Sequence, residues 1–155
     1  FYVLDLGCAP GSWLQVLKEF KNINFIVGID LLNVEPIDGV YIAEQDIKDY
    51  DSYTQLFEKK DSKLDLVLSD IAPNITGISD IDQSNFSYIA IDILRFCRFK
   101  LKPNGMLVMK YFLGSSFETT RKTLNNNFSK INVFKPASSK KKSNEVYLIC
   151  IGFKD

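Results

Sequence analysis

The chain has 155 residues, and its 46% hydrophobic and 25% charged side chains are typical of a folded globular protein rather than a disordered one. Nineteen basic side chains balance nineteen acidic ones, so a nucleic-acid partner would have to bind a local basic patch. Histidine is absent, which excludes His-based triads and zinc sites with His ligands. We predict no metal site and, since no apolar run is long enough to span a bilayer, no membrane span.

Apolar periodicity predicts strands and helices that alternate along the chain. Strands are expected at 1–6, 24–30, 40–43, 64–70, 105–112, 130–135 and 145–153. Helices are expected at 12–21, 49–60, 84–101 and 115–127, and Pro103-Asn104-Gly105 is expected to form a turn. The alternation predicts one α/β domain over 1–155, with a mostly parallel sheet covered by helices on both faces. The last two strands are too close in sequence for a parallel crossover, so they should be antiparallel.

A turn with two glycines, Gly7 and Gly11, joins the first predicted strand to the first helix. Such a turn brings backbone and the positive end of a helix up to a ligand, and ligands of open α/β sheets bind at the carboxyl ends of the strands. Ala9 stands where a dinucleotide-binding turn has its second glycine, and Pro10 narrows the approach further. The turn therefore favours S-adenosylmethionine over a nicotinamide dinucleotide, the alternative.

Trp13, on the first turn of that helix, has two interpretations. Its spacing with Val16, Leu17 and Phe20 predicts a helix face packed in the core. Its position beside the glycine turn predicts a contact with the cofactor. The sequence alone supports both equally.

Four carboxylates end or follow predicted strands: Asp5, Asp30, Asp46 and Asp70. Because the carboxyl ends of parallel strands lie along one edge, we expect these side chains to border one crevice. Asp30 follows the glycine turn at the distance, about 20 residues, that lets a carboxylate accept the ribose hydroxyls of a bound nucleoside. The alternative for Asp30 is a turn residue or a helix cap.

Lys110 interrupts an otherwise apolar strand, and a buried lysine is costly unless it is paired. Asp70 ends the strand 64–70, and Glu145 begins the last strand. If that strand is antiparallel, it starts at the edge where the parallel strands end, so Asp70, Lys110 and Glu145 should converge. The alternatives are a lysine that extends to solvent from the strand end and an ordinary glutamate at a strand edge.

Several motifs together resemble the FtsJ-type RNA 2′-O-ribose methyltransferases, above all the bacterial and mitochondrial branch that acts on large-subunit ribosomal RNA. The motifs are D-L-G-C-A-P-G-S-W at 5–13, S-D-I-A-P-N at 69–74, V-M-K at 108–110, and K-P at 135–136 followed by N-E-V-Y at 144–147. The likeness runs from residue 1 to about 153. It implies a Rossmann-like class I methyltransferase fold with a seven-stranded, mostly parallel sheet whose last strand is antiparallel, and S-adenosylmethionine as cofactor.

The resemblance also implies roles for single residues. Asp70, Lys110 and Glu145 match three members of the family's Lys-Asp-Lys-Glu set, with Lys110 as the catalytic lysine that accepts the proton of the 2′-hydroxyl. Two neighbouring carboxylates would favour instead an ammonium that orients the 2′-oxygen, and both possibilities stay open. The set's first lysine is expected before residue 1, in a preceding segment. Contacts with the cofactor are implied for Gly7, Pro10, Gly11, Trp13, Asp30, Asp46 and Asp70.

A basic cluster at Lys135, Lys140, Lys141 and Lys142 is expected to contact RNA phosphates, the alternative being a solvated loop. The expected activity is methyl transfer from S-adenosylmethionine to a ribose 2′-hydroxyl, foremost of a uridine in large-subunit ribosomal RNA. The alternatives are a tRNA 2′-O-methyltransferase, a small-molecule methyltransferase and a catalytically silent RNA-binding subunit.

Cys8, Cys97 and Cys150 have no metal-ligand spacing and form an odd set, which predicts reduced thiols in a reducing intracellular compartment. The sequence does not distinguish the cytoplasm from an organelle such as the mitochondrion. A targeting segment, where one exists, would precede Phe1, which already lies in a strand. We expect a monomer.

Overall fold

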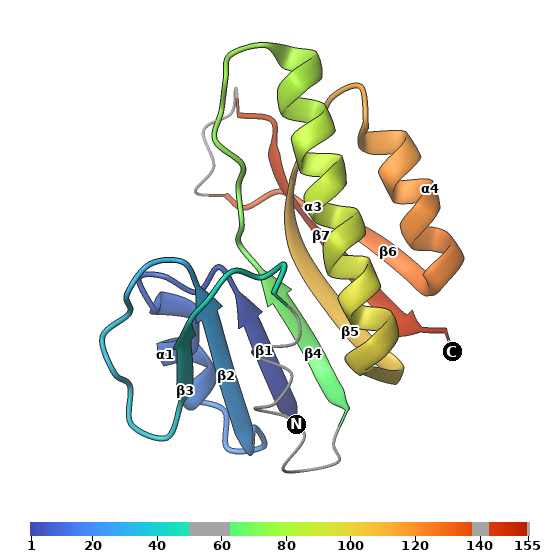
Figure 1. Cartoon of the computed structure of the whole chain (residues 1–155). Helices are drawn as coiled ribbons and strands as arrows, with labels where there is room; N and C mark the ends of the chain where they lie inside the picture. The colour runs from blue at the N-terminus through green and yellow to red at the C-terminus, as the bar shows by residue number, and fades with distance from the viewer. Residues whose placement is uncertain (50–62, 138–142, 155) are drawn as a thin grey trace.

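The computed structural model describes residues 1–49, 63–137 and 143–154 (Figure 1). Its strands are β1 (Tyr2–Leu6), β2 (Phe25–Asp30), β3 (Tyr41–Glu44), β4 (Leu64–Ser69), β5 (Leu101–Phe112), β6 (Phe128–Phe134) and β7 (Glu145–Phe153). Its helices are α1 (Ser12–Lys18), α3 (Ser79–Lys100) and α4 (Phe117–Asn127). Apart from Asp49, the helix predicted at 49–60 lies outside the described residues.

All seven strands belong to one sheet, in the order β3-β2-β1-β4-β5-β7-β6 (Figure 1). The pairs from β3 to β5 are parallel, while β7 is antiparallel to both of its neighbours, β5 and β6. The predicted mostly parallel sheet with an antiparallel last strand is therefore confirmed. Because β7 runs backwards, its first residue, Glu145, lies opposite Phe112 at the end of β5.

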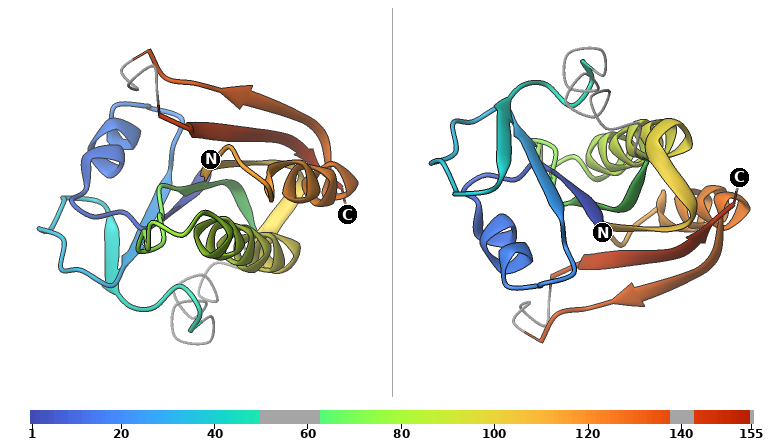
Figure 2. Two further views of the ribbon diagram at one scale, coloured as in Figure 1. Left: turned by 90° about the horizontal axis from the view of Figure 1, so that it is seen from above. Right: turned by 90° about the horizontal axis from the view of Figure 1, so that it is seen from below.

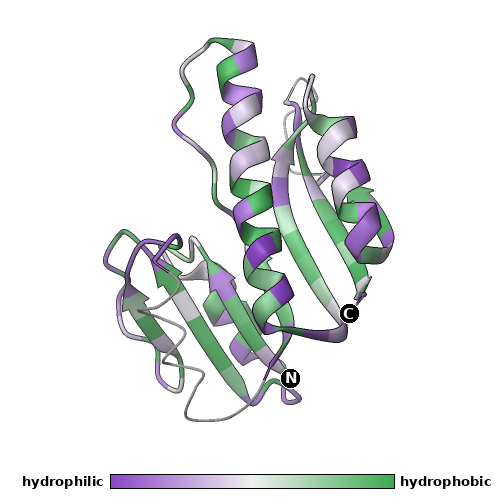
Figure 3. Ribbon diagram, turned by 45° about the vertical axis from the view of Figure 1, so that its right-hand side comes forward, coloured by the Kyte–Doolittle hydropathy of each residue, from purple (hydrophilic) through white to green (hydrophobic). Residues whose placement is uncertain are grey.

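Helices lie on both faces of the sheet: α1 on one face, and α3 with α4 on the other (Figure 2). The large core lies between the sheet and α3 and α4, where alternate residues of β5, namely Leu107, Met109 and Tyr111, are buried. A smaller cluster joins Leu14 and Leu17 of α1 to β1 and β2. Figure 3 shows the strands as mainly hydrophobic ribbons, as expected for a sheet with both faces apolar.

The helix α1 differs from its prediction in length and in the face that it buries. It ends at Lys18 rather than at residue 21, because the N–H groups of Glu19 and Phe20 bond three residues back and tighten the last turn. Leu14 and Leu17 face the core, whereas Val16 and Phe20 are exposed. The spacing that predicted a core face for Trp13 with Val16 and Phe20 was therefore misleading.

The boundary between α3 and β5 also differs from the prediction. The helix begins at Ser79, five residues early, with Asp80 and Asp82 in its positively charged first turn. The strand begins at Leu101, and the turn predicted at 103–105 is a bulge within it. There the register steps from Leu64↔Leu101 to Leu66↔Met106, and Asn104 adopts φ +65°.

One side of β4, β5 and β7 is apolar, and none of the described helices covers it fully. Leu66 and Leu68 of β4, Val108 of β5 and Ile149 of β7 are half-buried there. An apolar groove of about 340 Å³ runs along this side, lined by Trp13, Val16, Leu17, Leu68 and Val108. Lys110 lies on this same side of the sheet, since it is two residues beyond Val108 on β5.

Candidate functional site

A pocket of about 220 Å³ opens where β1 and β4 end. Its lining combines the glycine turn with two carboxylates: Asp5, Gly7, Cys8, Ala9, Pro10, Ser12, Trp13 and Asp70. Four of the predicted cofactor residues, namely Gly7, Pro10, Trp13 and Asp70, therefore line one pocket at the carboxyl edge of the sheet. Ligands of open α/β sheets bind at this edge.

The glycine turn requires glycine at position 7. Gly7 has φ +75°, and a Cβ built on it would lie 2.5 Å from Cγ1 of Ile71. Its N–H donates to the carbonyl of Ile29 at 2.8 Å, which ties the turn to β2. The peptide bond between Ala9 and Pro10 is cis. The turn is thus fitted closely between β2 and the segment after β4.

Gly7→Ala should cost more stability than Gly39→Ala, although both glycines have nearly the same φ, +75° and +74°. Both variants incur the left-handed penalty, roughly 1–2 kcal/mol. Only Gly7→Ala also forces a Cβ against Ile71, which adds roughly 1–3 kcal/mol, because a Cβ at Gly39 meets nothing within 4 Å. Urea unfolding of the two variants measures the difference, and equal losses would contradict this account of the turn.

The other predicted cofactor residues lie around the pocket rather than in its lining. Asp30 accepts hydrogen bonds from the N–H groups of Ala9 and Leu32, at 2.8 and 2.9 Å, so it holds the glycine turn in place. Asp46 accepts one from the N–H of Lys48 at 2.9 Å. Gly11 precedes α1 with φ +109°. The two aspartates thus act as turn residues here, and their contacts with the cofactor stay a prediction.

Asp5 is the most unusual group in the pocket. Its side chain is 1% exposed, and neither carboxylate oxygen has a hydrogen-bond partner among the described residues. Burial, with smaller contributions from the negative charges of Asp70 and Asp30, raises its pKa to about 7. A buried carboxylate without a partner is costly, and a bound cationic group would relieve that cost.

The structure brings the three predicted catalytic residues together. Lys110 Nζ lies 2.9 Å from Oδ1 of Asp70 and 3.9 Å from Oε2 of Glu145. The lysine side chain is only 14% exposed, against 35% and 30% for its two partners, so its charge is largely sheltered from water. Asp70 directly follows β4, Lys110 lies on β5 and Glu145 begins β7, and the antiparallel direction of β7 makes the meeting with Glu145 possible.

Tyr147 belongs to this cluster and is absent from the predicted site residues. Its hydroxyl donates to Oδ1 of Asp70 at 2.8 Å, and its ring lies 5.7 Å from that of Trp13. A signal was present in the sequence: residues two apart on a strand face the same side, so Tyr147 must share a side with Glu145.

Of the predicted RNA contacts, Lys135 is exposed after β6, and its ammonium donates to the carbonyl of Ser143. Lys140, Lys141 and Lys142 lie outside the described residues. Within 1–49, 63–137 and 143–154, no group of three or more Cys, Asp or Glu side chains could hold a metal ion, and no helix is long and apolar enough to cross a membrane.

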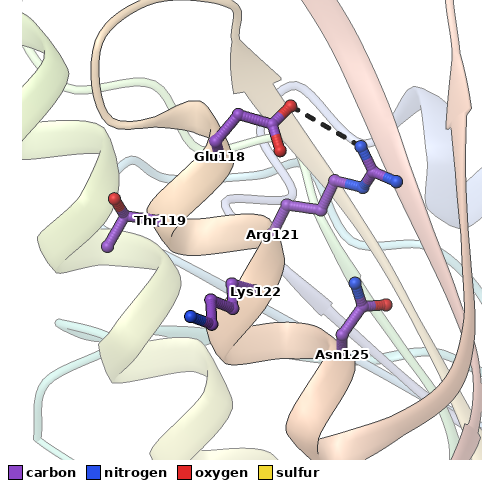
Figure 4. A pocket seen from close by; sticks show the side chains of 5 residues that line it. All are labelled: Glu118, Thr119, Arg121, Lys122 and Asn125. Carbon is purple, nitrogen blue, oxygen red and sulfur yellow. Dashed lines mark ion pairs between the residues drawn. The ribbon is translucent and has the colours of Figure 1, made fainter.

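Another hollow, of about 520 Å³, lies on α4 and offers less chemistry (Figure 4). Its lining side chains all come from that one helix: Glu118, Thr119, Arg121, Lys122 and Asn125. Glu118 and Arg121 are already paired with each other at 3.5 Å. Since exposed polar side chains of a single helix enclose nothing, the smaller pocket beside Lys110 is the better candidate site.

Comparisons with known proteins point the same way. Residues 1–153 match the family model of the FtsJ-like methyltransferases. A ribosomal RNA large subunit methyltransferase E from Methylobacillus flagellatus is 38% identical over 95% of this chain and 72% of its own length. A protein of the same name from Methanothrix thermoacetophila is 35% identical over 95% of this chain and 57% of its own.

A solved structure, described as a ribosomal RNA methyltransferase from Plasmodium falciparum, superposes with a TM-score of 0.86. It is 31% identical in sequence, and the match covers 98% of this chain and 86% of that one. The match extends over the whole sheet, including the strands that carry Asp70, Lys110 and Glu145. The chain belongs to the FtsJ-like methyltransferase family, the S-adenosylmethionine-dependent methyltransferases that its motifs resemble.

Proposed function

We propose that this protein transfers the methyl group of S-adenosylmethionine to a ribose 2′-hydroxyl, foremost of a uridine, in large-subunit ribosomal RNA. The observation that carries the proposal is the meeting of Lys110 with Asp70 and Glu145 beside a pocket that holds the unpartnered carboxylate of Asp5. A small-molecule methyltransferase would not need that trio.

The pocket suits S-adenosylmethionine in charge. The cofactor carries an ammonium and a sulfonium, and the pocket offers the carboxylates of Asp5 and Asp70. Trp13, which is only half-buried, presents an aromatic ring at the same place. Ala9 and Pro10 line the pocket where a dinucleotide-binding turn would need glycine for the approach of a pyrophosphate, so a dinucleotide is disfavoured.

When bound, the cofactor supplies an electrophilic methyl group on a positively charged sulfur. The residues then have to place and orient the attacking 2′-oxygen, and alignment alone contributes up to about 7–11 kcal/mol to such reactions. A lysine ammonium has three donors. Asp70, at 2.9 Å, is close enough to accept one, whereas Glu145, at 3.9 Å, is an ion-pair partner beyond hydrogen-bond distance, so the ammonium keeps a donor for the ribose oxygen. We therefore assign Lys110 the role of orienting that oxygen, with water as the final proton acceptor. The proton-accepting role that the family likeness implies is the alternative.

The RNA assignment rests on the relatives, which are named as ribosomal RNA large subunit methyltransferases, and on the exposed Lys135. The test is to incubate the full-length protein and methyl-labelled S-adenosylmethionine with undermethylated large subunits, small subunits or tRNA in separate reactions. We expect label in the large-subunit RNA. Label in tRNA alone would favour the tRNA enzyme, and binding of RNA without label would favour the catalytically silent subunit.

We further propose that the protein works as a monomer in a reducing intracellular compartment, cytoplasmic or organellar. Cys8, Cys97 and Cys150 are all unpaired and buried. Burial raises the pKa of the Cys8 and Cys150 thiols to about 12, which keeps them protonated and unreactive. Fractionation of cells and light scattering of the purified protein test these two statements.

A further inference from the structure

Tyr147 connects the pocket to the catalytic trio. Its hydroxyl donates to Oδ1 of Asp70 at 2.8 Å, and Lys110 Nζ reaches the same oxygen at 2.9 Å. Its ring packs against the ring of Trp13, which lines the pocket, with 5.7 Å between the ring centroids. One side chain therefore touches both the carboxylate that pairs with Lys110 and the aromatic wall of the pocket.

The strand register fixes this arrangement. Lys110 of β5 and Tyr147 of β7 are directly opposite each other in the antiparallel pair, so both side chains leave the sheet on the same side. Asp70 follows β4, the strand on the far side of β5. Two neighbouring strands thus send one donor each to Oδ1 of Asp70, which follows a third strand, and the two donors together restrict where that oxygen can lie.

The chemical consequence concerns Lys110. The carboxylate of an aspartate rotates easily about its last torsion, because that torsion has only broad preferences. If the Tyr147 hydroxyl is removed, Lys110 is the only one of the two donors left on Oδ1 of Asp70. Glu145, whose Oε2 lies 3.9 Å from Lys110 Nζ, would then compete with Asp70 for the lysine ammonium. A displacement of about 1 Å of a catalytic group can cost on the order of 100-fold in rate.

We propose that Tyr147 is a positioning residue for methyl transfer: its hydroxyl locks the Asp70 carboxylate in the orientation that holds Lys110 beside the pocket, while its ring ties that orientation to Trp13. This role rests on the proposed function. Burial, then the hydrogen bond to Asp70 and the negative charges of Asp70 and Glu145, raise the pKa of Tyr147 above its usual value. The phenol thus stays neutral and acts as a hydrogen-bond donor rather than as a base.

The kinetic test is Tyr147→Phe in the full-length protein, with undermethylated large ribosomal subunits and S-adenosylmethionine as substrates. The ring contact with Trp13 is kept, and only the hydroxyl is lost. We expect kcat to fall roughly 10- to 100-fold, while the KM for S-adenosylmethionine changes by less than about threefold. Tyr88→Phe, on the exposed face of α3, is the matched control and should leave both constants unchanged. A kcat of Tyr147→Phe within about twofold of the unaltered protein would overturn the proposal.

A second test does not depend on activity. With ¹³C-labelled tyrosine, the ring signal of Tyr147 should titrate above the ordinary tyrosine pKa of about 10. Asp70→Asn should lower that titration, since it removes the charge beside the phenol. Titration of Tyr147 at the ordinary pH in both proteins would contradict the hydrogen bond and overturn the proposal. Failure of the proposed function would give a different result: the unaltered protein would methylate no RNA, although the titration of Tyr147 would still report its hydrogen bond. In that case the proposed role of Tyr147 in the reaction would be wrong as well.

Discussion

Lys110→Ala should abolish methyl transfer and leave the affinity for S-adenosylmethionine within a few fold. The lysine meets Asp70 and Glu145 at 2.9 and 3.9 Å but is not among the residues that line the pocket. Positioned groups that handle or orient a reacting proton are worth roughly 100- to 10,000-fold in rate. Single-turnover methyl transfer and calorimetric titration with S-adenosylmethionine measure the two quantities separately.

The chain offers a closely matched control. Lys102 also lies on β5 and also pairs with an aspartate of the β4 region, Asp65, at 2.8 Å, but at the opposite edge of the sheet. Lys102→Ala removes a similar ion pair and should leave kcat within about twofold, because that pair lies at the end of the sheet away from the pocket. If Lys110→Ala lost affinity and rate equally, Lys110 would be a cofactor-binding residue and its catalytic assignment would be wrong.

Asp5→Asn should change how the stability of the protein depends on pH. The pKa of Asp5 is raised from 3.8 to about 7. A carboxyl whose pKa is higher in the folded than in the unfolded state favours unfolding once the unfolded chain ionises and the folded one stays protonated. The unaltered protein should therefore lose stability as pH rises from about 4 to about 7. The loss attributable to this group is on the order of 4 kcal/mol, and Asp5→Asn should remove it.

Asp65→Asn is the control of opposite sign. Burial opposes ionisation of Asp65, but hydrogen bonds from Lys102 and from the N–H of Tyr2 outweigh it and lower its pKa. Its contribution to stability is therefore present at neutral pH and lost on acidification. Urea unfolding between pH 4 and pH 8 gives the free energy of unfolding of each variant, and the slopes of that free energy against pH are compared. Identical slopes for Asp5→Asn and the unaltered protein would contradict the buried, unpartnered state of Asp5.

The same titration should appear in cofactor binding. A cationic ligand beside Asp5 binds best to the ionised carboxylate, so the affinity for S-adenosylmethionine should rise between pH 6 and pH 8. Asp5→Asn should flatten that rise. An affinity that is independent of pH in the unaltered protein would place the cofactor's positive charges away from Asp5.

Much of the fold follows from the sequence because strand runs and glycine turns are local signals. The strand ends at Asp30, Asp70 and Glu145 were predicted within one residue. The convergence of Asp70, Lys110 and Glu145 followed from one topological argument, the short connection before β7. Helix faces were harder: the apolar spacing predicted for α1 included Val16 and Phe20, which are exposed, and only packing against β1 and β2 selects Leu14 and Leu17.

Other features depend on contacts that sequence spacing does not reveal. The bulge at Asn104 extends β5 beyond the predicted turn, because the sheet absorbs the extra residues instead of ending there. The state of Asp5 depends on the absence of a partner within the folded pocket, which no pattern encodes. The side of the sheet on which Tyr147 lies could be predicted from its spacing to Glu145. Its hydrogen bond to Asp70 could not, because it depends on the distance between two strands.

The central claim, methylation of a ribose 2′-oxygen, is tested most directly by the chemistry of the product. Large-subunit RNA methylated by the full-length protein is hydrolysed in alkali, which cleaves next to every free 2′-hydroxyl but not next to a 2′-O-methyl group. We predict that the labelled methyl group is recovered in an alkali-resistant dinucleotide, and that Lys110→Ala yields none. Label recovered in mononucleotides as a methylated base, or no label in RNA at all, would contradict the account.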